Sequence, residues 1–316
     1  MPQTFQFLLL PGFSMMGLMS AIEPLRAANR FCRDAFAWRL LSQDGDAVQA
    51  SNGMSLNVDS ALELPAAGDS LFVVAGYEPL LHFNARLGAW LRRADREAGL
   101  LGGIDTGSFV LAEAGLFGDQ CLTLHWEAIE AFKERYPRLT VTQELFEIDG
   151  RRITSAGGTA TLDLMLTLIG RKHGEQLALE VSEQFVLSRI RSRQDHQRMQ
   201  IASRYDLHNK KLVQVIGEME RHSEQPLSSQ ALADLVKVTP RQLERLFRHH
   251  LDETPSGFYL NLRLDKARQL LRQTDMSVLE VGLACGFESS SYFSRCYRAR
   301  FATCPSQDRH EQSAVG

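Results

Sequence analysis

The chain has 316 residues, the length of about two ordinary domains. Hydrophobic residues make up 44% and charged residues 23%, a composition typical of soluble globular proteins that provides enough apolar side chains for a core in each domain. The net charge of −3 hides a mildly basic back half: residues 171–316 hold 22 Lys and Arg against 18 Asp and Glu, which favours a polyanion partner there, although many solvated helical domains are equally basic.

The five cysteines exclude several protein classes. Their number is odd, their spacing is irregular and no Cys-x-x-Cys pair occurs, so neither a disulfide framework nor a zinc site is expected. The first residues lack the basic stretch of a signal peptide, and no window approaches the roughly 18 consecutive apolar residues of a membrane-spanning helix. We therefore expect a cytoplasmic protein without a metal, a cofactor or a membrane contact.

Strand-like and helix-like segments alternate along the front half. Short apolar runs predict strands at residues 5–10, 38–42, 71–75, 100–104 and 152–155. Helical spacing predicts helices at residues 17–32, 84–98, 108–116, 126–135 and from residue 159 onward. This alternation is typical of a mostly parallel sheet, whose ligands bind beyond the carboxyl ends of the strands. We therefore expect one crevice surrounded by the turns at residues 12–14, 76–78, 105–107 and 157–159.

Residues 227–247 have the pattern of a helix-turn-helix. Ser228 or Ser229 can cap the first helix, Thr239 is a favourable N-cap of the second, and Pro240 suits the first helical position. In this motif the second helix lies in the major groove with its first residues at the base edges. We expect DNA contacts from Thr239, Arg241, Gln242 and Arg245.

Residues 277–301 repeat this pattern. Gly286 supplies the turn, and residues 288–291 open the next helix with capping and phosphate-binding residue types. The expected DNA contacts are Glu288, Ser289, Ser290, Ser291, Tyr292, Arg295 and Arg298, and Arg300 is also expected to be available to DNA. Residues 255–274 predict one helix of about 30 Å between the two units, close to the 34 Å or so of one B-DNA turn. A plain helical bundle is the alternative, but it does not account for two such units in tandem.

Residues 208–308 closely resemble the AraC/XylS family of transcriptional regulators. The resemblance is carried by Thr-Pro-Arg-Gln-Leu-Glu-Arg-Leu-Phe at 239–247, Leu-Asp-Lys-Ala-Arg-Gln-Leu-Leu at 264–271, and Ala-Cys-Gly-Phe at 284–287 with Tyr-Phe-Ser-Arg from 292 and Tyr-Arg-Ala-Arg-Phe to 301. Two residues depart from the family pattern: Ala302 stands where Gly is usual, and Lys237 stands at a turn position that is often Gly. The resemblance implies a regulator that binds tandem major-groove half-sites, with small local adjustments at the two departures.

The segment from Gly103 to Leu116, with Thr123 to Trp126, resembles the class I glutamine amidotransferase-like superfamily, and the likeness extends over residues 4–170. In catalytic members a Cys occupies the position of Asp105, with a His near His125 and a Glu near Glu23. A carboxylate replaces the thiolate nucleophile here, so we expect no enzyme activity. Two alternatives remain: Asp105 acts covalently in an amidase or deglycase fused to a DNA-binding tail, or it only caps the following helix.

The pair of domains resembles the GlxA-type subgroup, and Asp-Thr-Gly-Ser-Phe at 105–109 resembles regulators of carnitine, glycine betaine, methylglycine or arginine catabolism. This implies an effector that is a quaternary or methylated amine, and acidic and aromatic side chains suit such a cation. The expected ligand residues are Phe13, Glu23, Tyr77, Glu78, Asp105, Thr106, His125 and Trp126. Phe13 and Trp126 are equally compatible with a place in the core.

These observations predict a flavodoxin-like (class I glutamine amidotransferase-like) α/β sandwich at residues 1–175, a polar helical connector or linker at 176–207, and an all-α domain with two helix-turn-helix units at 208–308. We expect a homodimeric, ligand-responsive activator of an amine-catabolic operon, in which effector binding favours one arrangement of the domains. The alternative is a DNA-binding dimer that responds to no ligand.

Overall fold

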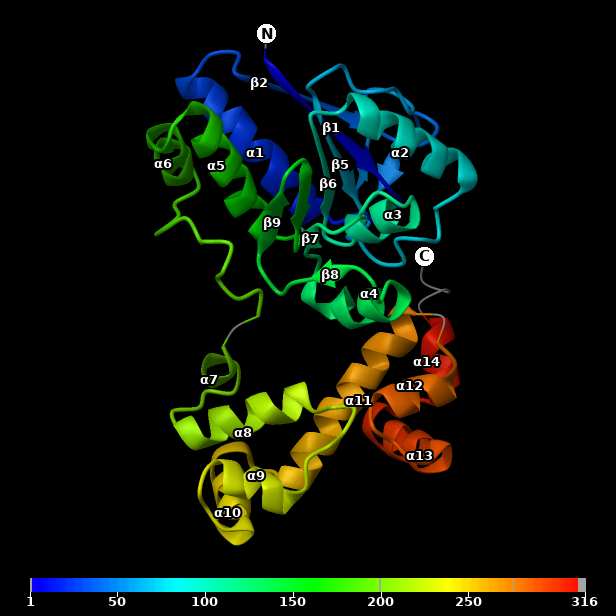
Figure 1. Cartoon of the computed structure of the whole chain (residues 1–316), viewed down its shortest axis with the longest axis vertical. Helices are drawn as coiled ribbons and strands as arrows, with labels where there is room; N and C mark the ends of the chain where they lie inside the picture. The colour runs from blue at the N-terminus through cyan, green and yellow to red at the C-terminus, as the bar shows by residue number, and fades with distance from the viewer. Residues whose placement is uncertain (1, 199, 275, 312–316) are drawn as a thin grey trace. The chain divides into compact units, whose positions relative to one another are not determined.

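The structure, a computed structural model, describes residues 2–198, 200–274 and 276–311 (Figure 1). The chain divides into two compact units, Met1–Gln197 and Arg198–Gly316. The first unit is a sheet between layers of helices, and the second is entirely helical. The predicted fold class is confirmed: a flavodoxin-like α/β domain precedes an all-α domain with two helix-turn-helix units.

The described residues of the first unit form a six-stranded sheet with the order β2-β1-β5-β6-β10-β9. Its strands are β1 (Gln3–Leu9), β2 (Phe36–Leu41), β5 (Ser70–Val74), β6 (Leu100–Ile104), β9 (Phe146–Asp149) and β10 (Arg152–Ser155). Neighbouring strands are parallel except for β10 and β9, which are antiparallel. The five strands predicted from the sequence are therefore present, and β9 is an edge strand that was not predicted.

Alternate residues of the central strands serve two different cores, as the two-residue period of a strand requires. Phe7 of β1 and Phe72 of β5 pack with helices α1 (Met15–Phe31) and α5 (Ala160–His173) on one face. Leu8 and Val73, their sequence neighbours, pack with α2 (Ala85–Glu97) and α3 (Gly107–Glu113) on the other face. Figure 1 shows the sheet between these two layers. Both faces are buried, which explains why the central strands are continuous apolar runs.

Smaller elements complete the first unit. Two short ribbons pair β3 (Val48–Gln49) with β4 (Ser55–Leu56) and β7 (Cys121–Leu122) with β8 (Thr140–Val141). The helix predicted at residues 126–135 begins as a 3₁₀ turn, η1 (Trp126–Ala128), and continues as α4 (Ile129–Arg135). Helix α6 (Glu175–Gln184) packs against α5 and α1. The chain from residue 185 to Gln197 has no helix or strand and still belongs to this unit.

The second unit contains two small cores that share one helix. Its helices are α7 (Ile201–Arg204), α8 (Lys210–Arg221), α9 (Ser229–Leu235), α10 (Pro240–Leu251), α11 (Pro255–Gln273), α12 (Val278–Ala284), α13 (Ser290–Phe301) and α14 (Pro305–Glu311). The N-terminal part of α11 packs with α8, α9 and α10, and its C-terminal part packs with α12 and α13. Within the described parts of the chain, no helix has both the length and the apolar character needed to cross a bilayer.

Candidate functional site

Asp105 lies on a sharp turn between β6 and α3. Its backbone has a φ of +61°, in the left-handed region that residues with a Cβ atom seldom adopt. Its amide donates a hydrogen bond to the carbonyl oxygen of Ser155 at 3.0 Å. A Cβ atom on Gly157 would lie 2.6 Å from Oδ2 of Asp105, so the carboxyl group rests directly on the bare backbone of this glycine. Backbone strain of this kind is concentrated at functional sites.

Four turns at the carboxyl ends of the strands meet around Asp105. The Thr106 hydroxyl donates to the carbonyl oxygen of Gly76, in the turn after β5. Phe13, in the turn after β1, makes isolated bridges to Gly76 and Ala50. The contact of Gly157 with Asp105 adds the turn after β10. The sheet topology therefore places the turns that the sequence singled out around one point.

The electrostatic environment of Asp105 is unusual for a carboxyl group. Burial raises its pKa to about 6, and this effect outweighs the opposing influences of His125 and of a hydrogen bond from Ser14. Glu127, two residues after His125, raises the pKa further, and its Oε2 lies 3.8 Å from Nδ1 of His125. Asp105 is therefore mostly ionised at neutral pH in a place that disfavours its charge. The expected ligand residues include neither Ser14, although it belongs to the turn expected at the crevice, nor Glu127. Each directly follows an expected ligand residue in the sequence.

The other predicted ligand residues have different environments. Phe13 has no exposed surface and belongs to the hydrophobic core, which is the alternative considered for it above. Glu23 lies on α1 and pairs with Arg26, one turn further along the helix, at 2.7 Å. Tyr77 is 62% exposed and Glu78, with a φ of +49°, is also exposed. Trp126 is partly buried, with its ring centroid 5.6 Å from that of His125.

In the second unit, α9 and α10 form the first helix-turn-helix. Thr239 and Gln242 form a capping box: the Thr239 hydroxyl accepts from the Gln242 amide at 3.2 Å, and Gln242 Oε1 accepts from the Thr239 amide at 2.9 Å. Arg241 and Arg245 are exposed on the same helix, whose buried side carries Leu243 and Phe247. The start of α10 is therefore rigid, and both arginines project from its solvent side.

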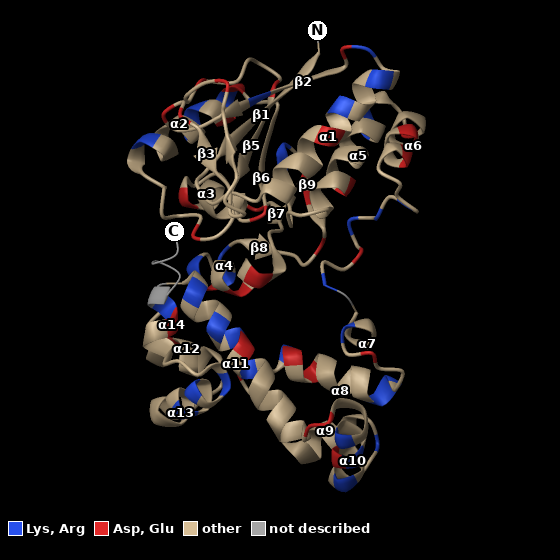
Figure 2. Ribbon diagram, turned by 180° about the vertical axis from the view of Figure 1, so that it is seen from behind, with Lys and Arg blue, Asp and Glu red and all other residues tan. Residues whose placement is uncertain are grey.

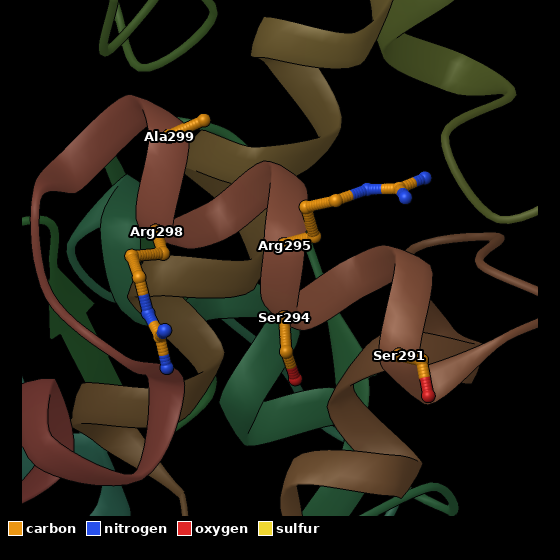
Figure 3. A pocket seen from close by; sticks show the side chains of 5 residues that line it. All are labelled: Ser291, Ser294, Arg295, Arg298 and Ala299. Atoms are coloured by element: carbon orange, nitrogen blue, oxygen red, sulfur yellow. The ribbon is translucent and has the colours of Figure 1, made fainter.

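Helices α12 and α13 form the second helix-turn-helix. Arg295 and Arg298 line a depression of about 470 Å³ together with Ser291, Ser294 and Ala299 (Figure 3). The Arg295 guanidinium lies 5.4 Å from the ring centroid of Tyr292, and Arg298 donates to Sγ of Cys304 at 2.7 Å. Figure 2 shows basic residues on both α10 and α13. Both helices therefore present cations, with hydroxyl groups beside them on α13.

The remaining predicted contacts of the second unit lie at the start of α13. Ser289 is its N-cap and accepts from the Tyr292 amide at 3.4 Å. Glu288, Ser290 and Ser291 are exposed. Arg300 is also exposed, and its guanidinium pairs with the carboxylate of Asp265 on α11 at 2.7 Å.

The two departures from the family pattern have a common backbone conformation. Lys237, in the turn between α9 and α10, has a φ of +53°, and Ala302, at the end of α13, has a φ of +58°. Both positions therefore require the left-handed conformation for which glycine carries no penalty. Lys237 and Ala302 adopt this conformation at the cost of some backbone strain.

The two helix-turn-helix units are tied to each other through α11. The hydroxyl of Tyr259 on this helix donates to the carbonyl oxygen of His222 at 2.7 Å and accepts from the amide of Leu227 at 3.3 Å. The loop between α8 and α9, which contains His222 and Leu227, also contacts the turn of the second helix-turn-helix. A Cβ atom on Gly286 in that turn would lie 2.6 Å from the carbonyl oxygen of Glu224 in the loop. The loop therefore packs between α11 and the turn that joins α12 to α13.

Comparisons with known proteins agree with both halves of this description. The DJ-1/PfpI family model matches residues 5–171, and a helix-turn-helix domain model matches residues 232–311. The chain is 69% identical to the HTH-type transcriptional regulator CdhR of Pseudomonas aeruginosa over 309 residues, which cover 98% of this chain and 92% of that protein. It is 42% identical to the HTH-type transcriptional regulator GbdR of the same species over 312 residues, which cover 98% and 85% respectively.

A solved structure of another transcriptional regulator also resembles this chain. The crystal structure of an AraC family transcriptional regulator from Pseudomonas putida aligns with a TM-score of 0.53 and 32% identity, over 58% of this chain and 100% of that chain. The relatives of full length are named as transcriptional regulators, and the matched domain of the second unit binds DNA. The chain therefore belongs to the AraC family of transcriptional regulators, in the group that carries a DJ-1/PfpI domain in front of its helix-turn-helix domain.

Proposed function

We propose that the first unit senses a small cationic amine, such as carnitine, glycine betaine or a methylated glycine, and that DNA binding by the second unit responds to it. The observation that carries this proposal is Asp105. Its carboxyl group lies where four turns meet, and burial disfavours its charge. A ligand cation beside it would offset that cost, because opposite charges favour the ionised form.

Aromatic side chains near the turns support a methylated ammonium group. Tyr77 follows β5 and is largely exposed, and Trp126 lies beside His125. An ammonium over such a ring gains about 0.5–2 kcal/mol, depending on how far it is desolvated. A carboxylate with aromatic neighbours therefore suits a quaternary amine better than it suits a neutral or anionic metabolite.

We propose that the first unit has no catalytic activity. The turn after β6 carries a carboxylate where the resemblance places a cysteine nucleophile. The two cysteines of this unit lie elsewhere: Cys32 ends α1 and Cys121 starts β7. We further propose that the protein acts in the cytoplasm as a homodimer that activates transcription, and that the first unit forms the contact between the two subunits.

On the DNA side, we propose that the starts of α10 and α13 enter successive major grooves. The base-reading residues are Arg241, Gln242, Arg245 and Arg295, with Arg298 and the residues around Ser289 available to bases or phosphates. Helix α11, with its 19 residues, is about 28 Å long and joins the two helix-turn-helix units as one rigid rod. This length is compatible with half-sites about one helical turn apart.

A calorimetric titration with matched ligands tests the sensing role. Glycine betaine and carnitine are compared with 3,3-dimethylbutanoate, which has the shape of glycine betaine but a carbon in place of the charged nitrogen. We expect the amine to bind at least about tenfold more tightly than the isostere, which lacks the cationic nitrogen and keeps only the carboxylate. We also expect the amine to bind more weakly below about pH 6, where Asp105 is protonated. Equal binding of the amine and its isostere, or binding of neither, contradicts the proposal.

A pair of variants locates the binding site. Asp105→Asn removes the charge and keeps the size of the side chain, and we expect it to weaken binding of the amine by at least about tenfold. Asp119→Asn is the matched control, because Asp119 is an exposed acid in a loop after α3. An equal loss in the two variants would mean that only the overall charge of the unit matters.

A further inference from the structure

Residues 185–197, here called the strap, run from the end of α6 to the last residue of the first unit. The strap has no helix or strand, yet side chains tie it to the first unit at several points. The next residue, Arg198, begins the DNA-binding unit. The strap is therefore the covalent route between the proposed effector crevice and the DNA-binding helices.

Arg191 makes the first attachment. Its Nε and Nη2 atoms lie 2.9 and 2.6 Å from Oδ2 of Asp163, and its backbone amide donates to Oδ1 of the same carboxylate at 2.8 Å. Nη2 also donates to the hydroxyl of Thr159 at 2.8 Å. Asp163 is buried in the first turn of α5, and Thr159 follows the Gly157–Gly158 turn on which Asp105 rests. Arg191 thus holds the end of the turn that contacts Asp105.

Gln197 makes the second attachment, at the segment that precedes His125. Its Nε2 lies within hydrogen-bond distance of three acceptors: the Thr123 hydroxyl at 3.0 Å, the Leu124 carbonyl at 3.1 Å and the Glu144 carbonyl at 2.8 Å. The first two belong to the segment that leads directly into His125. Because all three neighbours are acceptors here, the amide nitrogen rather than the oxygen must face them.

A third attachment lies between these two. Arg193 pairs with the buried carboxylate of Glu147 at 2.8 Å, and its carbonyl oxygen accepts from the amide of Leu145 at 2.9 Å. The strap therefore follows the edge strand β9. Among the described residues, Oε1 of Gln197 is buried without a hydrogen-bond partner. An orphaned acceptor of this kind lowers the stability of the docked strap.

We propose that Arg191 and Gln197 are positioning residues of the effector site and couple it to the DNA-binding unit. They hold the Gly157–Thr159 turn and the segment before His125. A ligand that orders these two segments strengthens the docking of the strap, and a docked strap shortens the free tether in front of the DNA-binding unit. Tether length sets how two linked DNA-binding units search for paired sites. This inference rests on the proposed sensing role of the crevice.

The test uses the full chain and matched variants within the strap. Gln197→Ala removes the attachment, and Gln197→Glu keeps the volume but replaces the donor by acceptors. Gln194→Ala is the control for both, since Gln194 is an exposed glutamine of the same strap. Arg191→Ala is paired with Arg189→Ala, because Arg189 bonds only within the strap among the contacts described for it, to Asp195.

Without any ligand, hydrogen exchange of the backbone amides tests the positioning role. We expect Gln197→Ala, Gln197→Glu and Arg191→Ala to speed exchange roughly tenfold in the strap and in the segments 123–125 and 157–159, and the controls to match the wild type. Exchange in the crevice segments that is the same in variants and controls overturns the positioning role, whatever the effector is.

With glycine betaine or carnitine as the probe, the factor by which the ligand changes DNA affinity tests the coupling. The DNA is a fragment selected from a random-sequence pool by the full chain. We expect ligand to slow exchange in the strap of the wild type. We also expect the coupling factor, measured at ligand concentrations that saturate each protein, to fall close to one in Gln197→Glu. An unchanged coupling factor contradicts the coupling role of the strap. If the wild type binds neither amine, the proposed effector class is wrong, and the hydrogen-exchange result alone decides the positioning role of the strap.

Discussion

Arg263 on α11 donates a hydrogen bond from Nε to the carbonyl oxygen of Cys285 at 2.7 Å. Its Nη2 donates to the carbonyl oxygen of Gly286 at 2.5 Å, and its guanidinium lies 4.2 Å from the ring centroid of Phe287. The last carbonyl groups of a helix lack partners inside the helix, and a cation at this end satisfies them. The turn before α13 is therefore fixed to α11, the helix that also packs against α10.

Replacing Gly286 with alanine should loosen this connection. Gly286 has a φ of +72°, and an added Cβ atom would lie 2.6 Å from the carbonyl oxygen of Glu224. We expect Gly286→Ala to lower the free energy of unfolding of the second unit by roughly 1–3 kcal/mol, measured by urea denaturation. Gly217→Ala is the control, because Gly217 lies inside α8 with room for a methyl group, and it should leave stability unchanged or raise it.

Removing the carboxylate of Asp308 should destabilise the end of the second unit. This buried group accepts hydrogen bonds from Arg268 at 2.8 Å, Arg272 at 2.6 Å and the Tyr297 hydroxyl at 2.6 Å. Asp308→Ala leaves two cations and a buried hydroxyl without their partner, and we expect a loss of about 3–5 kcal/mol in thermal or urea unfolding. Asp265→Ala breaks an exposed pair with Arg300 and should cost at most about 1 kcal/mol. Similar losses in the two variants contradict this account.

The exposed arginines of the two reading helices should carry sequence-specific affinity. On the DNA fragment selected by the full chain, Arg241→Ala and Arg295→Ala should each weaken binding roughly 10- to 100-fold. Arg300→Ala should change it less than about threefold, because its guanidinium is occupied by Asp265. Binding is measured by fluorescence anisotropy at several salt concentrations. A loss for Arg300→Ala as large as for Arg295→Ala would show that α13 meets DNA with a different face.

The raised pKa of Asp105 predicts how the stability of the first unit depends on pH. Burial raises this pKa from 3.8 to about 6, so the folded state binds the proton more tightly than the unfolded chain does. The contribution to stability is complete below about pH 4 and is lost as pH rises to about 6. The difference in the free energy of unfolding between Asp105→Asn and the wild type should therefore depend on pH. We expect it to favour the variant by roughly 2–3 kcal/mol more at pH 7.5 than at pH 4.

Unfolding of both proteins by urea at the two pH values measures this difference. Groups that titrate equally in both proteins cancel in the comparison. Glu78→Gln, which neutralises an exposed acid in a neighbouring turn, should show no such pH-dependent gain. A gain for Asp105→Asn that is the same at both pH values would mean that the carboxyl group is not buried enough to shift its pKa.

Local patterns were sufficient to predict most of the fold. The apolar runs around Phe7 and Phe72, the capping residue Thr239 and the turn at Gly286 all act through neighbours in the chain or through simple burial, and the structure contains the elements they predict. Strand β9 was missed, since Glu147 interrupts its apolar pattern and is buried only because Arg193 pairs with it from 46 positions away.

The candidate sites depend more on distant pairs. Arg300 was predicted to face DNA, and its partner Asp265 lies 35 residues earlier in the sequence. Phe13 could be assigned to a crevice or to the core from sequence, and only the packing of the sheet places it inside. The strap looked like a polar connector because its partners, such as Thr123 for Gln197, are 74 positions apart. Side chains whose role is set by a distant partner cannot be recognised by period or propensity.

Asp105 places a carboxylate where catalytic relatives of this fold carry an oxidisable cysteine thiol. A thiolate on this turn could be converted by peroxide to sulfenic and sulfinic acids, which change both its charge and its size. A carboxylate has no such series of oxidation states. An oxidant therefore finds no thiol to convert at this position of the chain.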